Sequence, residues 1–194
     1  MILALAVALG CIASLVRHRS RAFGQIAAIP LRSAWLAPLA LVLQWPLLRA
    51  PPGPTQHIGV QQALFLLSYL LLLVFAWRNW RLTGILIAGL GVICNLVVIA
   101  VNGGLMPITP GTLVRINPGS IPEQWLVGEH YGYSKDVILH RHETKLWALS
   151  DTLVIPPPFP KPTAFSLGDL LIAVGVVVLL QGPGISSKRA ATPP

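Results

Sequence analysis

Residues 60–101 read VQQALFLLSYLLLLVFAWRNWRLTGILIAGLGVICNLVVIAV, two long apolar runs separated by the pentapeptide Trp77-Arg78-Asn79-Trp80-Arg81. Each run is near the ~17 to 25 residues that an apolar helix needs to cross a bilayer. Because only five residues connect them, the two helices must be antiparallel neighbours. The sequence therefore predicts a membrane-embedded helical hairpin at about 60–77 and 82–101.

Three further apolar runs lie at about 1–16, 33–48 and 167–182, and the five runs divide the rest of the chain between two sides of a membrane. One side receives only bases, namely Arg17, Arg19, Arg21, Arg32, Arg78, Arg81, Lys188 and Arg189. The other side receives every acidic residue, balanced by an equal number of bases. The net charge of +8 therefore lies on the first side, which the positive-inside rule makes cytoplasmic.

The overall composition also favours a membrane protein. Hydrophobic residues make up 54% of the chain and charged residues 10%, well below the ~25% of soluble domains. The bases are spread over short loops beside the apolar runs, where they orient helices and meet anionic lipids, so the composition does not indicate a nucleic-acid-binding protein. The first run has no preceding bases and is followed by Arg17, which favours retention over cleavage as a signal peptide.

We therefore expect an all-α polytopic membrane protein with five transmembrane helices, its N-terminus outside and its C-terminus in the cytoplasm. Residues 1–101 would form a four-span region, 102–165 a Pro-rich extracytoplasmic segment, 166–185 the fifth transmembrane helix and 186–194 a disordered cytoplasmic tail. Along the fourth span, a face of small residues would let another helix approach closely; it comprises Gly84, Ala88, Gly89 and Gly91. Asn95 in the same span predicts either an interhelical hydrogen bond or a polar pathway, and the former is the commoner role.

The outer segment is expected to turn at Asn102-Gly103-Gly104 and to contain one short helix. Residues 134–150 favour that helix, because Ser134 can cap its start, Asp136 suits its first turn and apolar residues recur within it. Residues 155–162 contain five prolines and predict a stiff extended strap that leads into the last span.

Two carboxylates stand out by position: Asp151 before the strap and Asp169 just inside the last span. Two carboxyl groups at close range can divide the roles of acid and base, because they cannot both ionise easily. The alternative is structural. Ser166-Leu167-Gly168-Asp169 is a capping box for a helix start, and Asp151 has the features of a turn residue.

The run Phe165-Ser166-Leu167-Gly168-Asp169, followed by an apolar helix, resembles the last-span motif of signal peptidase II, an aspartate-dependent enzyme that trims bacterial lipoproteins. Asp151 lies upstream at a spacing similar to that of the family's other catalytic aspartate, and Asn102-Gly103-Gly104 is loosely similar to its Asn-x-Gly segment. The resemblance implies a catalytic Asp151/Asp169 dyad with Asn102 as a positioning group. The chain departs from the family around Asp151, where Gly-Asn does not precede and Arg does not follow, and in having five predicted spans.

Histidines in the outer segment raise the possibility of a metal site. His140 and His142 are two residues apart, which on a helix would point them to different faces, and His130 lies nearby in sequence. A solvated polar patch is therefore favoured over zinc binding. The sequence predicts no cofactor.

A wider pattern covers most of the chain and joins Asn102-Gly103-Gly104, Ser134-Lys135-Asp136 and the Asp169 motif. It resembles a family of uncharacterised small bacterial membrane proteins, which implies an inner-membrane location and no particular activity. Two classes of function follow. The first is binding of a lipid or a membrane-protein partner on the outer face through aromatic residues, namely Trp125, Tyr131, Tyr133 and Trp147. The second is hydrolysis by Asp151 and Asp169.

Overall fold

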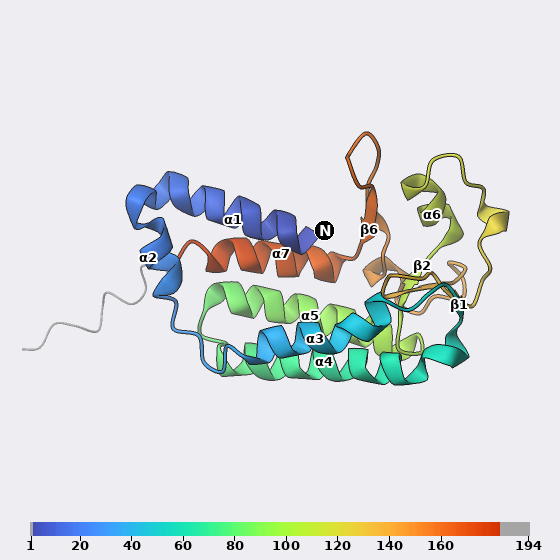
Figure 1. The fold of residues 1–194 in the computed structure, drawn as a ribbon, viewed down its shortest axis with the longest axis horizontal. Coiled ribbons are helices and arrows are strands. Elements are labelled where there is room, and N and C mark those ends of the chain that lie inside the picture. The colour runs from blue at the N-terminus through green and yellow to red at the C-terminus, as the bar shows by residue number, and fades with distance from the viewer. Residues whose placement is uncertain (1, 183–194) are drawn as a thin grey trace, which may run out of the picture.

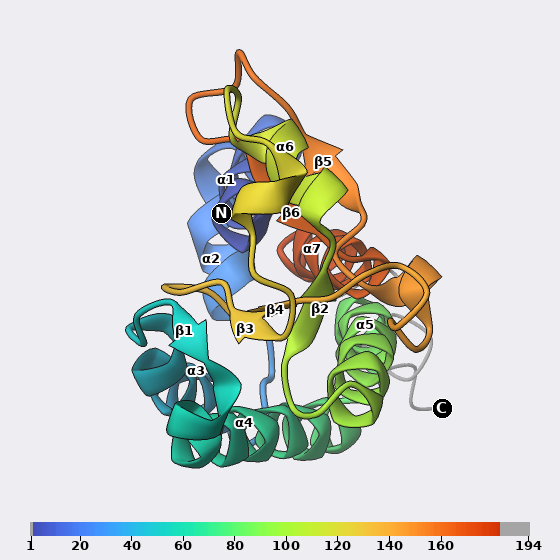
Figure 2. The same ribbon diagram turned by 90° about the vertical axis from the view of Figure 1, so that its right-hand side faces the viewer.

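The computed structural model describes residues 2–182 and is mostly helical, with the long helices side by side and the outer segment gathered at one end of them (Figure 1). The helices that contact one another form the series α1, α7, α5, α4, α3, so the last helix lies between the first and the fifth. Figure 2 shows this arrangement from the outer end. The helical elements before the outer segment are α1 (Ile2–His18), η1 (Arg19–Arg21), α2 (Ala22–Ala27), α3 (Leu36–Leu48), η2 (Thr55–Ile58), α4 (Gly59–Arg78) and α5 (Thr83–Val101), and α7 (Leu167–Leu179) follows it.

Within residues 2–182, two helices are long and apolar enough to cross a membrane. They are α4 with its preceding turn, Thr55–Arg78 (24 residues), and α5, Thr83–Val101 (19 residues). They contact each other, so the predicted pairing of these two helices as a hairpin is confirmed. The other three predicted spans form the shorter apolar helices α1, α3 and α7. The expected tail at 186–194 lies outside the described residues.

Helices α5 and α7 form the tightest contact in the bundle, as the small residues of α5 predict. A Cβ atom added at Gly84 would lie 2.6 Å from the carbonyl oxygen of Gly175, and one added at Gly175 would lie 2.8 Å from the Cβ of Ala88. Side chains larger than hydrogen would therefore hold the two helices apart at these positions. Gly84, Ala88 and Gly91 therefore face the last helix of the chain, whereas a Cβ atom added at Gly89 would lie 3.1 Å from the Cβ of Ala76 in α4.

The outer segment contains strands, so the expectation of an all-α chain is wrong in this region. A four-stranded sheet has the order β1-β3-β4-β2, formed by β1 (Gly53–Pro54), β3 (Glu129–His130), β4 (Asp136–Ile138) and β2 (Met106–Ile108). Strand β4 pairs in parallel with β2, where Met106 is opposite Asp136, and in antiparallel with β3. Strand β1 comes from the turn after α3, so the sheet ties two separate outer loops together.

The predicted helix at 134–150 is wrong for the same reason. Its first residues form β4, whose backbone groups bond to β2 and β3, and only Trp147–Leu149 forms a short 3₁₀ turn, η4. Ser134 does accept a hydrogen bond from the Asp136 amide, but it does so in a turn before a strand. Distant strand pairing has therefore outweighed the local helix signals.

The remaining outer elements are the short helix α6 (Pro110–Ile116), the turn η3 (Pro122–Gln124) and a hairpin of β5 (Leu153–Ile155) and β6 (Thr163–Phe165). The two strands pair in antiparallel, with Leu153 opposite Phe165. The proline-rich residues 155–162 therefore reverse the chain, and the predicted extended strap is wrong. After this reversal, β6 leads the chain to the N-terminal end of α7.

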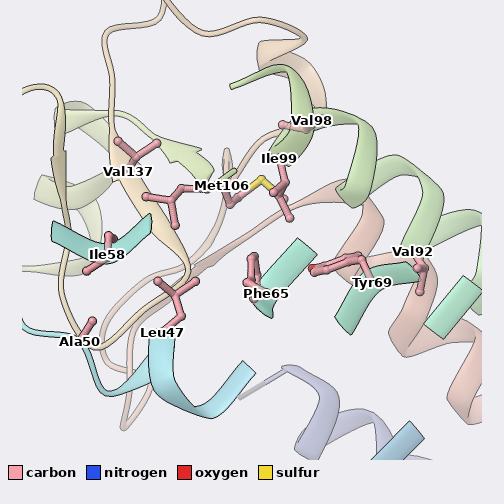
Figure 3. Packing of buried hydrophobic residues seen from close by; sticks show 11 residues of the cluster. Leu47, Ala50, Ile58, Phe65, Tyr69, Val92, Val98, Ile99, Met106 and Val137 are labelled. Carbon is pink, nitrogen blue, oxygen red and sulfur yellow. The ribbon is translucent and has the colours of Figure 1, made fainter. Parts of the chain in front are cut away.

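A hydrophobic core joins the outer segment to the helices. It combines Leu47 of α3, Phe65 and Tyr69 of α4, Ile99 of α5 and Met106 of β2. Figure 3 shows these side chains converging from the helix ends and from the sheet. All five are at most 6% exposed, so the outer segment is packed onto the bundle as one body with it.

Candidate functional site: a buried lysine–aspartate cluster

The predicted carboxylates Asp151 and Asp169 meet at one side chain, Lys135. The Nζ atom of Lys135 lies 2.7 Å from Oδ2 of Asp169 and 3.3 Å from Oδ1 of Asp151. The two carboxyl groups are therefore close in space although 18 residues separate them in the sequence. We call Lys135, Asp151 and Asp169, together with their neighbours Asn95, Asp136 and Ser166, the Lys135 cluster.

Asp169 is placed by the start of α7. The Ser166 side chain accepts a hydrogen bond from the Asp169 amide at 2.9 Å, and the Asp169 carboxylate accepts one from the Ser166 amide at 3.3 Å. This reciprocal pair is the capping box that the sequence predicts. Asp169 therefore has a structural role at the helix start in addition to its contact with Lys135.

Asn95 links this helix start to α5. Its Nδ2 donates to Oδ1 of Asp169 at 2.7 Å, and its Oδ1 accepts from the Ser166 hydroxyl at 2.7 Å. Asn95 is fully buried, and its bond to Ser166 is made away from solvent, whereas its bond to Asp169 is partly buried. The interhelical hydrogen bond expected of Asn95 is confirmed, and its partner is the site aspartate.

Lys135 is held in place by the outer sheet. Its carbonyl oxygen accepts a hydrogen bond from the Met106 amide at 2.9 Å, just before β4 begins. The turn that precedes it is fixed by His130, whose ring nitrogens lie 3.1 Å from the Pro51 carbonyl oxygen and 3.0 Å from that of Ser134. The strand pairing thus places the Lys135 ammonium beside the N-terminal end of α7.

Asp151 is buried beside the same sheet, with 1% of its side chain exposed. Its amide donates to the carbonyl oxygen of Pro107 in β2 at 3.2 Å. Asp136 is also buried, and its Oδ1 has no hydrogen-bond partner among the described residues. The cluster therefore gathers three aspartates around one lysine.

Burial and this excess of acid shift the pKa values of the cluster. Burial raises the pKa of Asp151 well above its ordinary value; Lys135 opposes this rise, and the neighbouring acids Asp136 and Asp169 add to it. Burial likewise raises the pKa of Asp136. Burial disfavours the charge on Lys135, but the two carboxylates it contacts outweigh that effect and raise its pKa well above the usual value. Burial and the Lys135 ammonium therefore act in opposite directions on the pKa of Asp151 and of Asp136.

Asn102 lies apart from the Lys135 cluster. Its side-chain amide donates to the carbonyl oxygens of Val98 and Lys145, and its Oδ1 accepts from the Lys145 amide. These bonds fasten the chain around residue 145 to the end of α5. Asn102 has no hydrogen bond to either aspartate in this structure, in contrast to the positioning role that the signal peptidase II resemblance implies.

The histidines do not gather around a common centre. His140 and His142 lie in a turn and their rings stack with centroids 5.3 Å apart. The prediction that a helix would point these two side chains to different faces is therefore wrong. His130 is instead occupied with backbone carbonyls. Within residues 2–182, no group of three or more His, Cys, Asp or Glu side chains is arranged to hold a metal ion.

A pocket of ≈ 500 Å³ opens on the outer segment between α6, η3 and the turn at 140–141. It is lined by Thr109, Pro110, Gly111, Pro122, Glu123, Trp125, Val127, His140 and Arg141. Trp125 packs edge-on against Tyr131 at 5.5 Å, and its indole Nε1 is buried without a hydrogen-bond partner among the described residues. Neither Asp151 nor Asp169 lines this pocket.

Sequence reasoning found Asp151, Asp169 and Asn95 but missed Lys135 as the group that joins the aspartates. The available signal was a lone base between Ser134 and Asp136, directly before the apolar pair Val137 and Ile138. A lysine beside a buried strand needs a carboxylate partner. The interpretation of this stretch as a surface helix concealed that need.

Comparison with known proteins agrees with the wider sequence pattern. No match was found among curated proteins or among solved structures. The model of one protein family, DUF5317, described as a family of unknown function, matches residues 28–181. Because this range covers most of the chain and all of the Lys135 cluster, the chain belongs to the DUF5317 family.

Proposed function

We propose that this chain is a five-span protein of a bacterial inner membrane that binds a membrane-protein partner through its outer pocket. Exposed apolar surface supports the membrane location. Large apolar side chains on all five helices are more than a third exposed, among them Leu9, Val42, Leu70, Leu90 and Val174. Such a surface is unfavourable in water and well solvated by lipid chains.

The shorter helices are compatible with five spans. Helices α3 and α7 have 13 residues each, which gives about 20 Å of helix against a hydrocarbon thickness of about 30 Å. Local thinning of the bilayer and flanking interfacial residues accommodate such a mismatch. Trp35 and Trp45 of the α3 region are both exposed and suited to the headgroup level.

Charge supports the orientation, with the start of α1 outside. The amide of Arg32, before α3, donates a hydrogen bond to the side chain of Asn79 at the end of α4. The Nε2 atom of His18, at the end of α1, lies 3.1 Å from the carbonyl oxygen of Gln181, after α7. These contacts place the basic loops at the end of the bundle opposite the outer segment (Figure 1). A reporter fused after Lys188, outside the described residues, should behave as cytoplasmic, and one inserted near Gly119 as external. The reverse result would overturn the topology.

One observation carries the binding proposal: the outer pocket contains a tryptophan whose buried indole N–H has no partner among the described residues. An unmade hydrogen bond of this kind is costly, and a ligand acceptor would remove the cost. Trp125 and Arg141 are also the residue types most enriched at the centres of protein interfaces. The pocket is lined by residues of α6, η3 and the turn at 140–141. Figure 1 shows α6 at the end of the molecule away from the long helices, which favours a protein partner over a lipid.

The test is photo-crosslinking in cells. A photoreactive residue at Val127, which lines the pocket, should give a discrete adduct with one membrane protein, and Trp125→Phe or Arg141→Ala should reduce its yield several-fold. A photoreactive residue at exposed Val60 and the variant Trp35→Phe are the matched controls. Identical adducts from both positions, or a yield that pocket variants do not change, would exclude binding at this pocket.

A second candidate is the aspartate-dependent hydrolase that the resemblance to signal peptidase II implies. The observation in its favour is the convergence of Asp151 and Asp169 on one nitrogen atom. Both oxygens of Asp169 already accept hydrogen bonds, so chemistry would require Lys135 to withdraw.

This candidate is tested with the full chain and a diacylglyceryl-modified prolipoprotein as substrate. Hydrolysis should be abolished in Asp169→Asn and in Asp151→Asn while both variants remain folded, because an amide keeps the size of the carboxyl group but cannot exchange protons. Lys145→Met, at an exposed lysine of the same segment, is the control. No cleavage above the buffer rate would remove the hydrolase.

A further inference from the structure

We propose that the turn between α4 and α5 forms a binding pocket for a phosphate-bearing anion, made by Arg32, Arg78 and Arg81 around Trp80. A cavity of ≈ 440 Å³ is lined by these four residues with Pro30, Asn79 and Leu82. No acidic residue lines the cavity. The site is separate from both the outer pocket and the Lys135 cluster.

The pocket is assembled by Asn79, so it does not depend on a chance meeting of flexible loops. The Asn79 side chain accepts a hydrogen bond from the Arg32 amide at 2.7 Å and donates to the Arg32 carbonyl oxygen at 2.8 Å. It also donates to the Phe75 carbonyl oxygen within α4. Asn79 is 4% exposed, so these bonds firmly hold a residue 47 positions away at the mouth of the helical hairpin.

Three like charges held around one cavity repel each other, and no carboxylate in residues 2–182 forms an ion pair with any of them. An anion would relieve this repulsion. Guanidinium groups match the oxygens of a phosphate through paired hydrogen bonds, which makes phosphate the anion best suited to arginines. Leu82, the residue before α5, cannot cap the helix with its side chain, so the first amides of α5 add to the positive field.

The position indicates where such an anion would come from. In the proposed topology this turn lies at the cytoplasmic leaflet, and Trp80 is 57% exposed, as expected of an indole at headgroup depth. A phosphatidylglycerol headgroup and a free phosphate ester both present the required chemistry. The experiment therefore has one arm for each source.

The full chain in a non-ionic detergent is titrated with phosphatidylglycerol and, separately, phosphatidylcholine, and bound lipid is counted by native mass spectrometry. We expect phosphatidylglycerol to bind at least about tenfold more tightly, and the triple variant Arg32→Gln, Arg78→Gln, Arg81→Gln to lose about tenfold or more. The matched control is Arg17→Gln, Arg19→Gln, Arg21→Gln, which removes the same charge from the neighbouring loop. It should lose less than about twofold.

Competition with glycerol 3-phosphate assigns the source. Displacement at similar concentrations indicates a soluble phosphate ester, and retention of the lipid indicates a headgroup site; either result supports a phosphate pocket. Equal losses in the two triple variants would show diffuse charge attraction and overturn the proposal, as would the absence of both a phosphatidylglycerol preference and displacement. If the glutamine variant does not fold, the corresponding Arg→Lys variant keeps the charge and should still lose several-fold, because lysine cannot form the paired contact.

Discussion

Replacement of Lys135 by methionine tests whether the Lys135 cluster holds the outer segment on the helices. Methionine keeps most of the length of the side chain and removes its charge, which leaves Asp169 without its contact at 2.7 Å. Removing one partner of a buried ion pair typically costs ~3 to 5 kcal/mol. Lys135 and Asp169 are 21% and 23% exposed, and Asp169 keeps its bonds to Asn95 and Ser166. We therefore expect a loss of about 2 to 3 kcal/mol in the free energy of unfolding.

Lys145→Met is the control, because Lys145 is exposed and only its backbone groups bond to Asn102. It should change stability by no more than ~0.5 kcal/mol. The full chain is unfolded by SDS titration in detergent micelles and followed by tryptophan fluorescence. Adding Asp169→Asn to Lys135→Met should recover more than half of the loss, since it removes the uncompensated charge.

Two results would refute this account of the cluster. One is a Lys135→Met loss no larger than that of the Lys145→Met control. The other is strict additivity of Lys135→Met and Asp169→Asn, which would mean that the two side chains do not interact energetically.

The remaining predictions concern protonation, helix packing and the Asn102 contact. Burial raises the pKa of Asp151 and Asp136 above their ordinary value of 3.8. The contribution of these two groups to the free energy of unfolding is therefore fully present below pH 3.8, and it is lost as the pH rises through their raised pKa values in the folded protein. Unfolding measured at about pH 5 and about pH 8 should show a less stable protein at the higher pH, and Asp151→Asn should flatten this dependence; an unchanged pH profile in the variant contradicts the assignment. Gly168→Ala would place a Cβ atom 2.6 Å from Cγ of Asn95 and 2.7 Å from the Gly91 carbonyl oxygen, so a loss of about 2 kcal/mol or more is expected in the same SDS titration. Gly24→Ala, whose Cβ would meet no atom within 4 Å, should be neutral or slightly stabilising, and equal effects at the two glycines would refute the close α5–α7 contact. Asn102→Ala removes three hydrogen bonds to residues 98 and 145 and should speed limited proteolysis near residue 145 several-fold, whereas an unchanged cleavage rate would show that these bonds do not hold the segment.

The helical part of the fold was predictable because its signals are local. Long apolar runs, a five-residue connection and the small residues of α5 are each visible within a short window of sequence. The strands are different, since none exceeds three residues and β2 pairs with a strand that begins 30 residues later, Met106 opposite Asp136. Such a pairing leaves no periodicity in either segment. The helix predicted at 134–150 therefore followed local preferences that the sheet overrides.

The same difference between local and distant contacts decides which parts of the candidate site were predictable. The capping box of Ser166 and Asp169 was predictable because its two members are three residues apart. The ion pairs of Lys135 join residues 16 and 34 positions apart, and they depend on the sheet that carries Lys135 to the mouth of α7. Asn102 shows the converse case. It belongs to a recognisable segment, yet the fold directs its amide to residue 145 and away from the aspartates.

The number of donors around Asp169 bears on the choice between a structural and a catalytic role for the cluster. A general base needs a lone pair that faces the substrate, whereas Lys135, Asn95 and the Ser166 amide already occupy this carboxylate. Asp151 has 1% of its side chain exposed and contacts the same ammonium. The same bonds connect α5, α7 and the outer sheet at one point, which is what a structural anchor for the outer segment requires. In the function that we propose, the cluster fixes the position of the outer segment and the partner is recognised by the pocket around Trp125, where a buried donor lacks an acceptor among the described residues.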